Sequence, residues 1–180
     1  MSQLTIYAEQ TPEQVLETSQ EFTTIAAKLK VIGVEFSRWQ ASVPIGIHDT
    51  QAQILDAYAP SITALKQAGG YTTADVVSLH PQHPDRASLR AKFLSEHTHS
   101  DDEVRFFVRG RGLFCISANE LVFAVMCEQG DLITVPAGLT HWFDMGSAPE
   151  FTCIRLFTRP EGWVATFTGR DIAAHIPAMA

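Results

Sequence analysis

The chain has 180 residues, of which 46% are apolar and 18% charged, and its 13 basic and 20 acidic residues give a net charge of −7. A chain of this length buries roughly 70% of its unfolded surface, enough for one domain with an enclosed site. The negative charge, without any basic run, excludes a nucleic-acid-binding surface, and no apolar run approaches the roughly 20 residues that span a bilayer.

The first residues and the cysteines indicate a cytoplasmic protein. The opening MSQLTIYAEQ has no basic start followed by an apolar stretch, as a secretory signal would have. Cys115, Cys127 and Cys153 are odd in number and widely spaced, lie in apolar segments and form no CxxC motif. We therefore expect reduced thiols that pack in the core.

The N-terminal half predicts a mixture of helices and strands. TPEQ at residues 11–14 is a helix start, because the threonine can cap, the proline fits the first turn and the glutamine can reach back. The apolar spacing continues this helix to about Lys30. Residues 31–39 alternate well enough for a strand.

A second capping pattern at Thr50 opens another helical stretch. Pro60 predicts a kink or break in it, and Gly69-Gly70 predicts its end. A short strand is expected at residues 75–79. One or two helical turns are expected after His83-Pro84.

From Glu96 onward the pattern changes to short strands separated by glycine and proline. The expected strands are 103–109 and 112–117, on either side of a turn at RGRG, followed by 121–127, 132–135, 141–145 and 151–157. Such spacing is typical of a small antiparallel barrel or jelly roll. We predict one domain over residues 1–180, mainly β with flanking helices (α+β), in which residues 1–95 pack on a barrel formed by 96–170.

The stretch EHTHSDDEVRFFVRG at residues 96–110 carries the clearest chemistry. Side chains alternate along a strand, so His97 and His99 share one face, and Glu103 and Arg105 share a face of the next strand. If the intervening turn lets both pairs look into the barrel, a divalent cation would offset the cost of burying the carboxylate. A buried Glu–Arg pair, or a solvated charged edge, remains the alternative.

A fourth candidate ligand lies downstream. The turn at Pro136-x-Gly138 leads into a strand that begins at His141, and neighbouring strand ends could bring this histidine to the other three residues. Three imidazoles and one carboxylate suit Fe(II) or Ni(II) better than zinc bound by thiolates or calcium bound by oxygens.

Both motifs resemble those of the cupins. His97-x-His99-x3-Glu103-x6-Gly110 resembles the first cupin motif, apart from Ala91 where a glycine often stands. Gly130-x5-Pro136-x-Gly138-x2-His141 resembles the second, apart from Met145 where an asparagine is usual. Neither departure removes a candidate ligand. The resemblance implies a cupin-type barrel.

Among the cupins, the chain resembles the acireductone dioxygenase family from about Val31 to Arg170. The stretches that carry this resemblance are GVEFSRWQ, EHTH, DDEVRFFV, GLF, VPAGLTHWFDMGS, FTCIRLF and EGW. It implies a monomeric enzyme of methionine salvage with one Fe(2+) or Ni(2+) per chain. Its substrates would be O2 and an acireductone, an enediol ketone with a methylthio tail.

The resemblance also implies roles for three residues beside the ligands. Arg105 would favour the substrate dianion, Glu96 would assist metal loading, and Asp102 would transmit local conformational changes. Each also has a structural reading: an ion pair for Arg105, a solvated loop carboxylate for Glu96 and a turn-forming aspartate for Asp102.

Several residues and functions stay open. There are three alternative functions. The first is another cupin enzyme with the same ligands, such as a sugar isomerase or another dioxygenase. The others are a non-catalytic binding cupin and a purely structural barrel. Phe93, Phe107, Phe143 and Trp163 are candidate cavity walls or ordinary core, and Arg155 is a possible supporting residue. We expect no metal ligation by His48, His80, His83 or His175.

Overall fold

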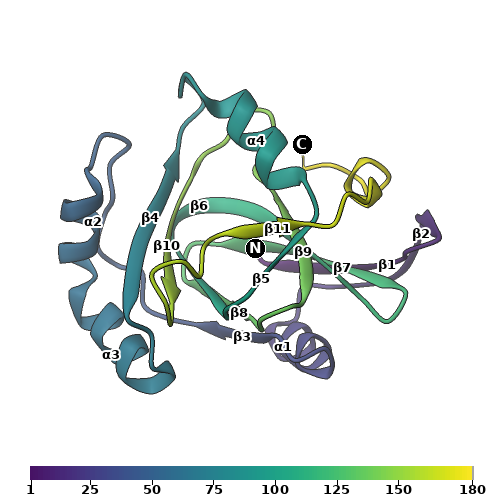
Figure 1. The fold of residues 1–180 in the computed structure, drawn as a ribbon, viewed down its shortest axis with the longest axis horizontal. Coiled ribbons are helices and arrows are strands. Elements are labelled where there is room, and N and C mark those ends of the chain that lie inside the picture. Colours follow the sequence, from purple (N-terminus) through teal and green to yellow (C-terminus); the bar gives the residue numbers. More distant parts are fainter. Residues whose placement is uncertain (180) are drawn as a thin grey trace.

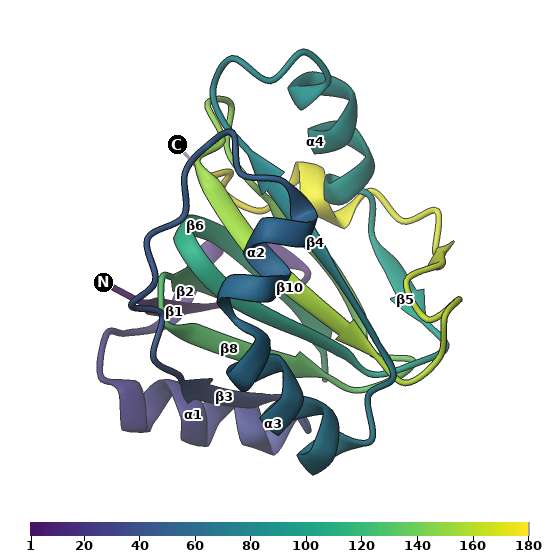
Figure 2. The same ribbon diagram turned by 90° about the vertical axis from the view of Figure 1, so that its left-hand side faces the viewer.

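The computed structural model describes residues 1–179, in which eleven strands form one antiparallel sheet that four α-helices flank (Figures 1 and 2). The mainly β fold class is thereby confirmed. The strands are β1 (Gln3–Ala8), β2 (Thr11–Ser19), β3 (Glu35–Arg38), β4 (Thr73–Leu79), β5 (His97–His99), β6 (Glu103–Ala118), β7 (Leu121–Glu128), β8 (Asp131–Val135), β9 (Thr140–Asp144), β10 (Phe151–Phe157) and β11 (Ala165–Phe167). The helices are α1 (Phe22–Val31), α2 (Gln51–Ala57), α3 (Ala59–Gly69) and α4 (Arg86–Leu94).

The long strand β6 joins the two sides of the barrel. Its first half pairs with β8 and β10, and its second half, from Arg111 onward, pairs with β7 and β9. The predicted RGRG turn is wrong, because the strand bends at Gly110 without ending. Gly110 has φ +67°, and a Cβ atom there would lie 1.8 Å from the carbonyl oxygen of Glu150. Only glycine fits this bend.

The predicted helix at residues 11–30 is wrong in its first part. Residues 11–19 form β2, an exposed strand paired with β1, and α1 begins only at Phe22. The Thr11 hydroxyl does lie 3.3 Å from Gln14 Oε1, so the capping side chains meet, but on a strand. Pairing with β1, whose other edge already binds β7, outweighs this local preference.

The second helical stretch agrees with the prediction. Thr50 forms a capping box with Gln53, the helix breaks into α2 and α3 just before Pro60, and Gly70 ends α3 in the left-handed conformation. The short strand predicted at 75–79 is the larger part of β4, and the helical turns predicted after Pro84 are α4.

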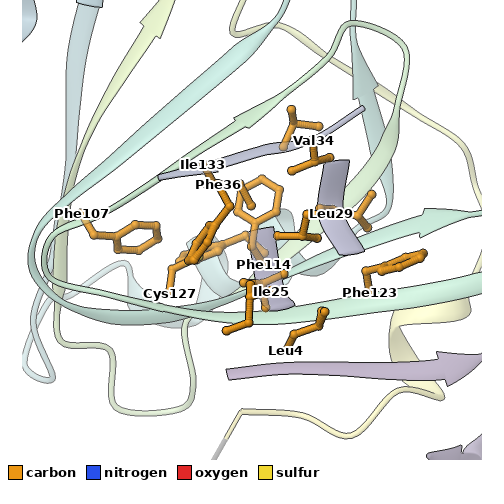
Figure 3. Close-up of a cluster of buried hydrophobic side chains, with 14 of the residues drawn as sticks. Leu4, Ile25, Leu29, Val34, Phe36, Phe107, Phe114, Phe123, Cys127 and Ile133 are labelled. Carbon is orange, nitrogen blue, oxygen red and sulfur yellow. The ribbon is translucent and has the colours of Figure 1, made fainter. Parts of the chain in front are cut away.

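Apolar side chains pack on both faces of the sheet. In β6, Val104, Phe106 and Val108 point outward against α2 and α3, whereas Phe107 joins the interior cluster on the other face. Helix α1 closes that interior cluster with Ile25 and Leu29, which pack among residues of β1, β3, β6 and β7 (Figure 3). This alternation turns Glu103 and Arg105 inward.

The N-terminal half also supplies sheet strands. Strand β3 pairs with β8, and β4 pairs with β10, so residues before 96 build part of the barrel wall itself. All three cysteines are free and buried, as predicted. In the described chain, no helix is both long and apolar enough to cross a membrane.

Candidate metal centre

Three histidines converge on neighbouring strands. His97 and His141 are direct cross-strand partners on β5 and β9, and His99 follows on the same face of β5. Their ring centroids are 4.6 to 5.2 Å apart, and one ring nitrogen of each lies within 4.8 Å of the others. All three side chains are buried.

Glu103 reaches the same point from the first half of β6. Its Oε2 lies 3.1 Å from His141 Nε2 and 3.2 Å from His99 Nε2, and the residue is only 1% exposed. The structure therefore brings together the four residues that the sequence proposed as ligands, from three strands.

Backbone carbonyls orient all three imidazoles. The Nδ1 atom of His97 lies 2.7 Å from the oxygen of Ser95, that of His99 lies 3.0 Å from the oxygen of Val164, and that of His141 lies 2.8 Å from the oxygen of Leu139. A carbonyl only accepts, so each Nδ1 carries the proton and each Nε2 keeps a lone pair. For His99 and His141 that lone pair would face the Glu103 carboxylate.

This arrangement fits a bound cation. A neutral imidazole has one N–H, so His99 and His141 cannot donate to both a carbonyl and Glu103 without gaining a second proton. A divalent metal ion removes the conflict, because it accepts the Nε2 lone pairs and the carboxylate together while each Nδ1–H still donates to its carbonyl. The donor set suits a borderline transition metal.

The surroundings keep His97 neutral and Glu103 ionised. Burial, followed by the nearby His141, lowers the pKa of His97 to about 4. Burial alone would raise the pKa of Glu103, but the adjacent Arg105 guanidinium holds that pKa well below its ordinary value. Metal ligation requires these protonation states.

Arg105 lies beside the centre. Its Nε donates to Glu103 Oε1 at 2.7 Å, and its guanidinium lies 5.1 Å from the ring centroid of Phe114 and 4.8 Å from that of Phe143. The side chain is 3% exposed, yet Nη1 has no hydrogen-bond partner in the described chain. A buried N–H without an acceptor is costly, so it marks a place for one.

A cavity of about 190 Å³ opens on this centre. Its polar lining includes His97, His99 and Arg105. Of the four aromatic residues predicted as walls or core, Phe93 and Trp163 line the cavity, whereas Phe107 and Phe143 lie in the core with 0% exposure. Sequence reasoning missed the remaining apolar walls, which are Val77, Leu89, Ala165 and Phe167.

Glu96 and Asp102 lie outside this cavity. Glu96 is 2% exposed and accepts from the Thr168 hydroxyl at 2.9 Å, with Arg170 Nε 3.4 Å away, so the solvated-loop reading is wrong. Asp102 Oδ1 accepts from the backbone of Ala137 at 2.8 Å. That bond ties the turn before Glu103 to the turn before His141.

Asp101 is a residue that sequence reasoning missed. It accepts hydrogen bonds from the backbone N–H groups of Thr158, Arg159 and Asp102 at 2.7, 2.9 and 3.0 Å, and from the Thr158 hydroxyl. These bonds fasten the turn between His99 and Glu103 to the end of β10. Nothing in the sequence distinguishes this aspartate from its neighbour.

The other histidines stay apart from the centre. Among the described residues, His97, His99 and His141 form the one group of three or more potential ligands whose donor atoms converge. His48, His80 and His83 lie near one another elsewhere, and His175 follows the short turn at 172–174.

Known proteins resemble the whole chain. The model of the ARD/ARD′ family matches residues 3–165. Acireductone dioxygenases of Pseudomonas aeruginosa (strain UCBPP-PA14) and Synechococcus sp. are each 54% identical over 99% of this chain and 99% of theirs. The solved acireductone dioxygenase from Bacillus anthracis, with a cadmium ion in its active centre, is 31% identical, with a TM-score of 0.80 over 93% of this chain and 98% of that one. The cupin-type fold is thereby confirmed.

Proposed function

Because this chain belongs to the ARD/ARD′ family of metal-dependent dioxygenases, we propose that it cleaves the acireductone of the methionine salvage pathway with O2. The substrate is 1,2-dihydroxy-3-keto-5-methylthiopentene. The observation that carries the proposal is the meeting of three imidazoles and the Glu103 carboxylate beside Arg105, whose buried Nη1 has no hydrogen-bond partner among residues 1–179.

The proposed metal ligands are His97, His99, Glu103 and His141. These four side chains would hold a divalent ion from the protein side and leave it open to a chelating substrate from the cavity. The bound ion would supply a Lewis acid and a template for substrate and O2. The chain's part is to hold neutral imidazoles in place through their Nδ1 carbonyl contacts and to keep the site largely dry.

Arg105 has the position to stabilise a dianionic substrate. A divalent ion with one carboxylate leaves one positive charge, and the guanidinium of Arg105 adds a second, which matches a doubly deprotonated enediolate. The interaction would be strong, because Arg105 is 2% exposed and little water screens it.

We propose that the metal decides the products. With Fe(2+), substrate and O2 would give 2-keto-4-methylthiobutanoate and formate, and with Ni(2+) they would give 3-methylthiopropanoate, formate and carbon monoxide. Both sets conserve the six carbons and five oxygens of the reactants. Nickel binds a given set of nitrogen and oxygen ligands more tightly than iron does. The supply of each metal would therefore decide which form accumulates.

Two further roles belong to the same proposal. Glu96, buried next to the first ligand, would assist metal loading, and Asp102 would couple the turns that precede Glu103 and His141. We also propose that the enzyme is a monomer and that it is cytoplasmic. The three free thiols suit the reducing cytoplasm.

The test measures metal content, O2 uptake and products for protein loaded with iron or nickel. The proposal expects uptake of one O2 per acireductone and carbon monoxide only from the nickel form. A sugar isomerase would consume no O2, and a non-catalytic binding protein would turn over nothing.

Arg105→Ala sharpens that test. It is expected to keep the metal, because none of the four ligands changes, and to lower kcat/KM at least about tenfold through loss of a charge-assisted hydrogen bond. Normal turnover by this variant would contradict the dianion argument.

A further inference from the structure

A row of charged side chains crosses three adjacent strands of the barrel. Asp75 on β4 is the cross-strand partner of Arg155 on β10, and Arg155 is in turn the partner of Arg105 on β6. Direct partners point to the same face of a sheet, so the two arginines lie side by side. Both line the cavity that His97 and His99 also line.

Fold stability alone does not explain this pair of arginines. Like charges directly opposite each other on neighbouring strands are destabilising, and both side chains are largely buried, at 3% and 14% exposure for Arg105 and Arg155. Each arginine has its own carboxylate, Glu103 for Arg105 and Asp75 for Arg155. The arrangement keeps two guanidinium groups at one cavity in spite of their repulsion.

Asp75 holds Arg155 in a defined orientation. Its two oxygens accept from Nε at 2.8 Å and from Nη2 at 2.6 Å, and the guanidinium lies 5.5 Å from the ring centroid of Phe157. This bidentate pair occupies one edge of the guanidinium, so Nη1 stays available to a ligand. Arg105 likewise binds Glu103 through Nε, and its Nη1 has no hydrogen-bond partner in the part of the chain that the structure describes.

We propose that Arg155 is a second substrate-binding arginine, which donates to an anionic oxygen of the bound substrate, and that Asp75 positions it. This inference rests on the proposed acireductone dioxygenase function. Apart from the exposed Lys92, which also lines the cavity, a divalent ion, two arginines and their two carboxylates leave two positive charges there, and the substrate dianion balances them. Arg155 therefore shares with Arg105 the selection of a doubly charged substrate.

The decisive variant is Arg155→Gln in the metal-loaded protein. It is expected to keep its metal content and to raise the KM for acireductone about tenfold or more, with a smaller effect on kcat, because a charge-assisted hydrogen bond to the substrate is lost. A KM within twofold of the wild-type value would overturn the proposal.

Two matched variants separate substrate binding from a structural ion pair. Asp75→Asn loosens the orientation of Arg155 but leaves the guanidinium at the cavity, so KM should rise, but less than in Arg155→Gln. The charge-swapped Asp75→Arg/Arg155→Asp variant keeps a pair but moves the cation, so it should be as impaired as Arg155→Gln. If Asp75→Asn is the more damaging change, or if the swapped variant turns over normally, the pair is only structural and the proposal fails.

Oxalate, a small dianion that chelates metals through oxygen, gives a readout that does not depend on turnover. Isothermal titration of the nickel-loaded protein should show about tenfold weaker oxalate binding by Arg155→Gln than by wild type. If the wild type leaves acireductone unchanged while this difference persists, the proposed function fails but the anion site stands. Equal oxalate affinities would overturn the anion site.

Discussion

Histidines gather in two groups of three in the described chain, and only one group has the geometry of a metal site. Ring centroids are 4.6 to 5.2 Å apart in one group, and neighbouring rings are 5.7 and 6.2 Å apart in the other. The first group is His97, His99 and His141, and the second is His48, His80 and His83.

The hydrogen bonds around the rings make the difference. In the first group every Nδ1 faces a backbone carbonyl, so every Nε2 presents a lone pair. In the second group His83 Nδ1 accepts from the backbone N–H of Asp85, which leaves the proton on Nε2. The first group also has a buried carboxylate, that of Glu103, among its rings. Proximity of imidazoles is therefore a weaker sign of a metal site than the groups that fix their protons.

His141→Ala should have the largest effect and break the first group. Loss of one of the four proposed ligands is expected to weaken metal affinity by more than the roughly tenfold to hundredfold typical of residues that only support ligands, and to abolish dioxygenase activity. His80→Ala, the matched control in the second group, should leave both unchanged. Metal per chain after dialysis measures the difference, and equal losses in both variants would remove the distinction between the two groups.

Glu103→Gln tests what the carboxylate adds to the first group. In the metal-free protein it leaves Arg105 buried beside a neutral amide, and breaking such a buried pair costs about 3–5 kcal/mol of unfolding free energy. Urea unfolding of the apoprotein measures this cost. The double variant Glu103→Gln/Arg105→Met should recover most of the stability but not the metal affinity. Equal stabilities of wild type and Glu103→Gln would contradict the pairing.

Asp101→Ala should have a smaller effect, because it loosens the turn within the first group without touching a ligand. Its loss should cost about 2 kcal/mol of unfolding free energy at pH 7, since the carboxylate accepts several hydrogen bonds. Burial alone would raise the pKa of Asp101, but bonds from Thr158 and Arg159 hold it below its ordinary value of 3.8.

The pH dependence of this variant follows from that lowered pKa. The Asp101 carboxylate stabilises the folded state above the unfolded value and loses this contribution as the pH falls through the lowered folded value. The difference in unfolding free energy between wild type and Asp101→Ala should therefore shrink below about pH 4. A difference that stays constant from pH 7 to pH 3 would contradict the role of the ionised carboxylate.

The fold was predictable where local and long-range preferences agree. The capping box at Thr50 and the glycine stop after α3 concern one helix each, and both are confirmed. The similar pattern at residues 11–14 gave a wrong helix, because these residues pair with β1, which the distant strand β7 holds in the sheet. The RGRG sequence looked like a turn because glycine permits both a turn and a bend within a strand.

The site was predictable in its side chains and not in its backbone. The alternation of His97, His99, Glu103 and Arg105 along two strands placed them on shared faces, and the structure brings them together with His141. The carbonyl of Val164, which orients His99, carries no mark in the sequence, because every residue has such a group. The same holds for the N–H groups that hold Asp101, so its importance emerges only from the packing of β10 against the turn.

The bend of β6 at Gly110 affects the candidate metal centre, although Gly110 itself does not belong to it. Glu103 and Arg105 precede this residue and the strand segment beside His141 follows it, so the angle at one backbone position sets the approach of the carboxylate to the imidazoles. Any side chain there would strike the main chain at Glu150. Substitutions at Gly110 should therefore be tolerated as poorly as substitutions of the proposed ligands, although glycine has no reactive side chain. At Gly110 they would act through misfolding, whereas at the proposed ligands they would act through loss of the metal.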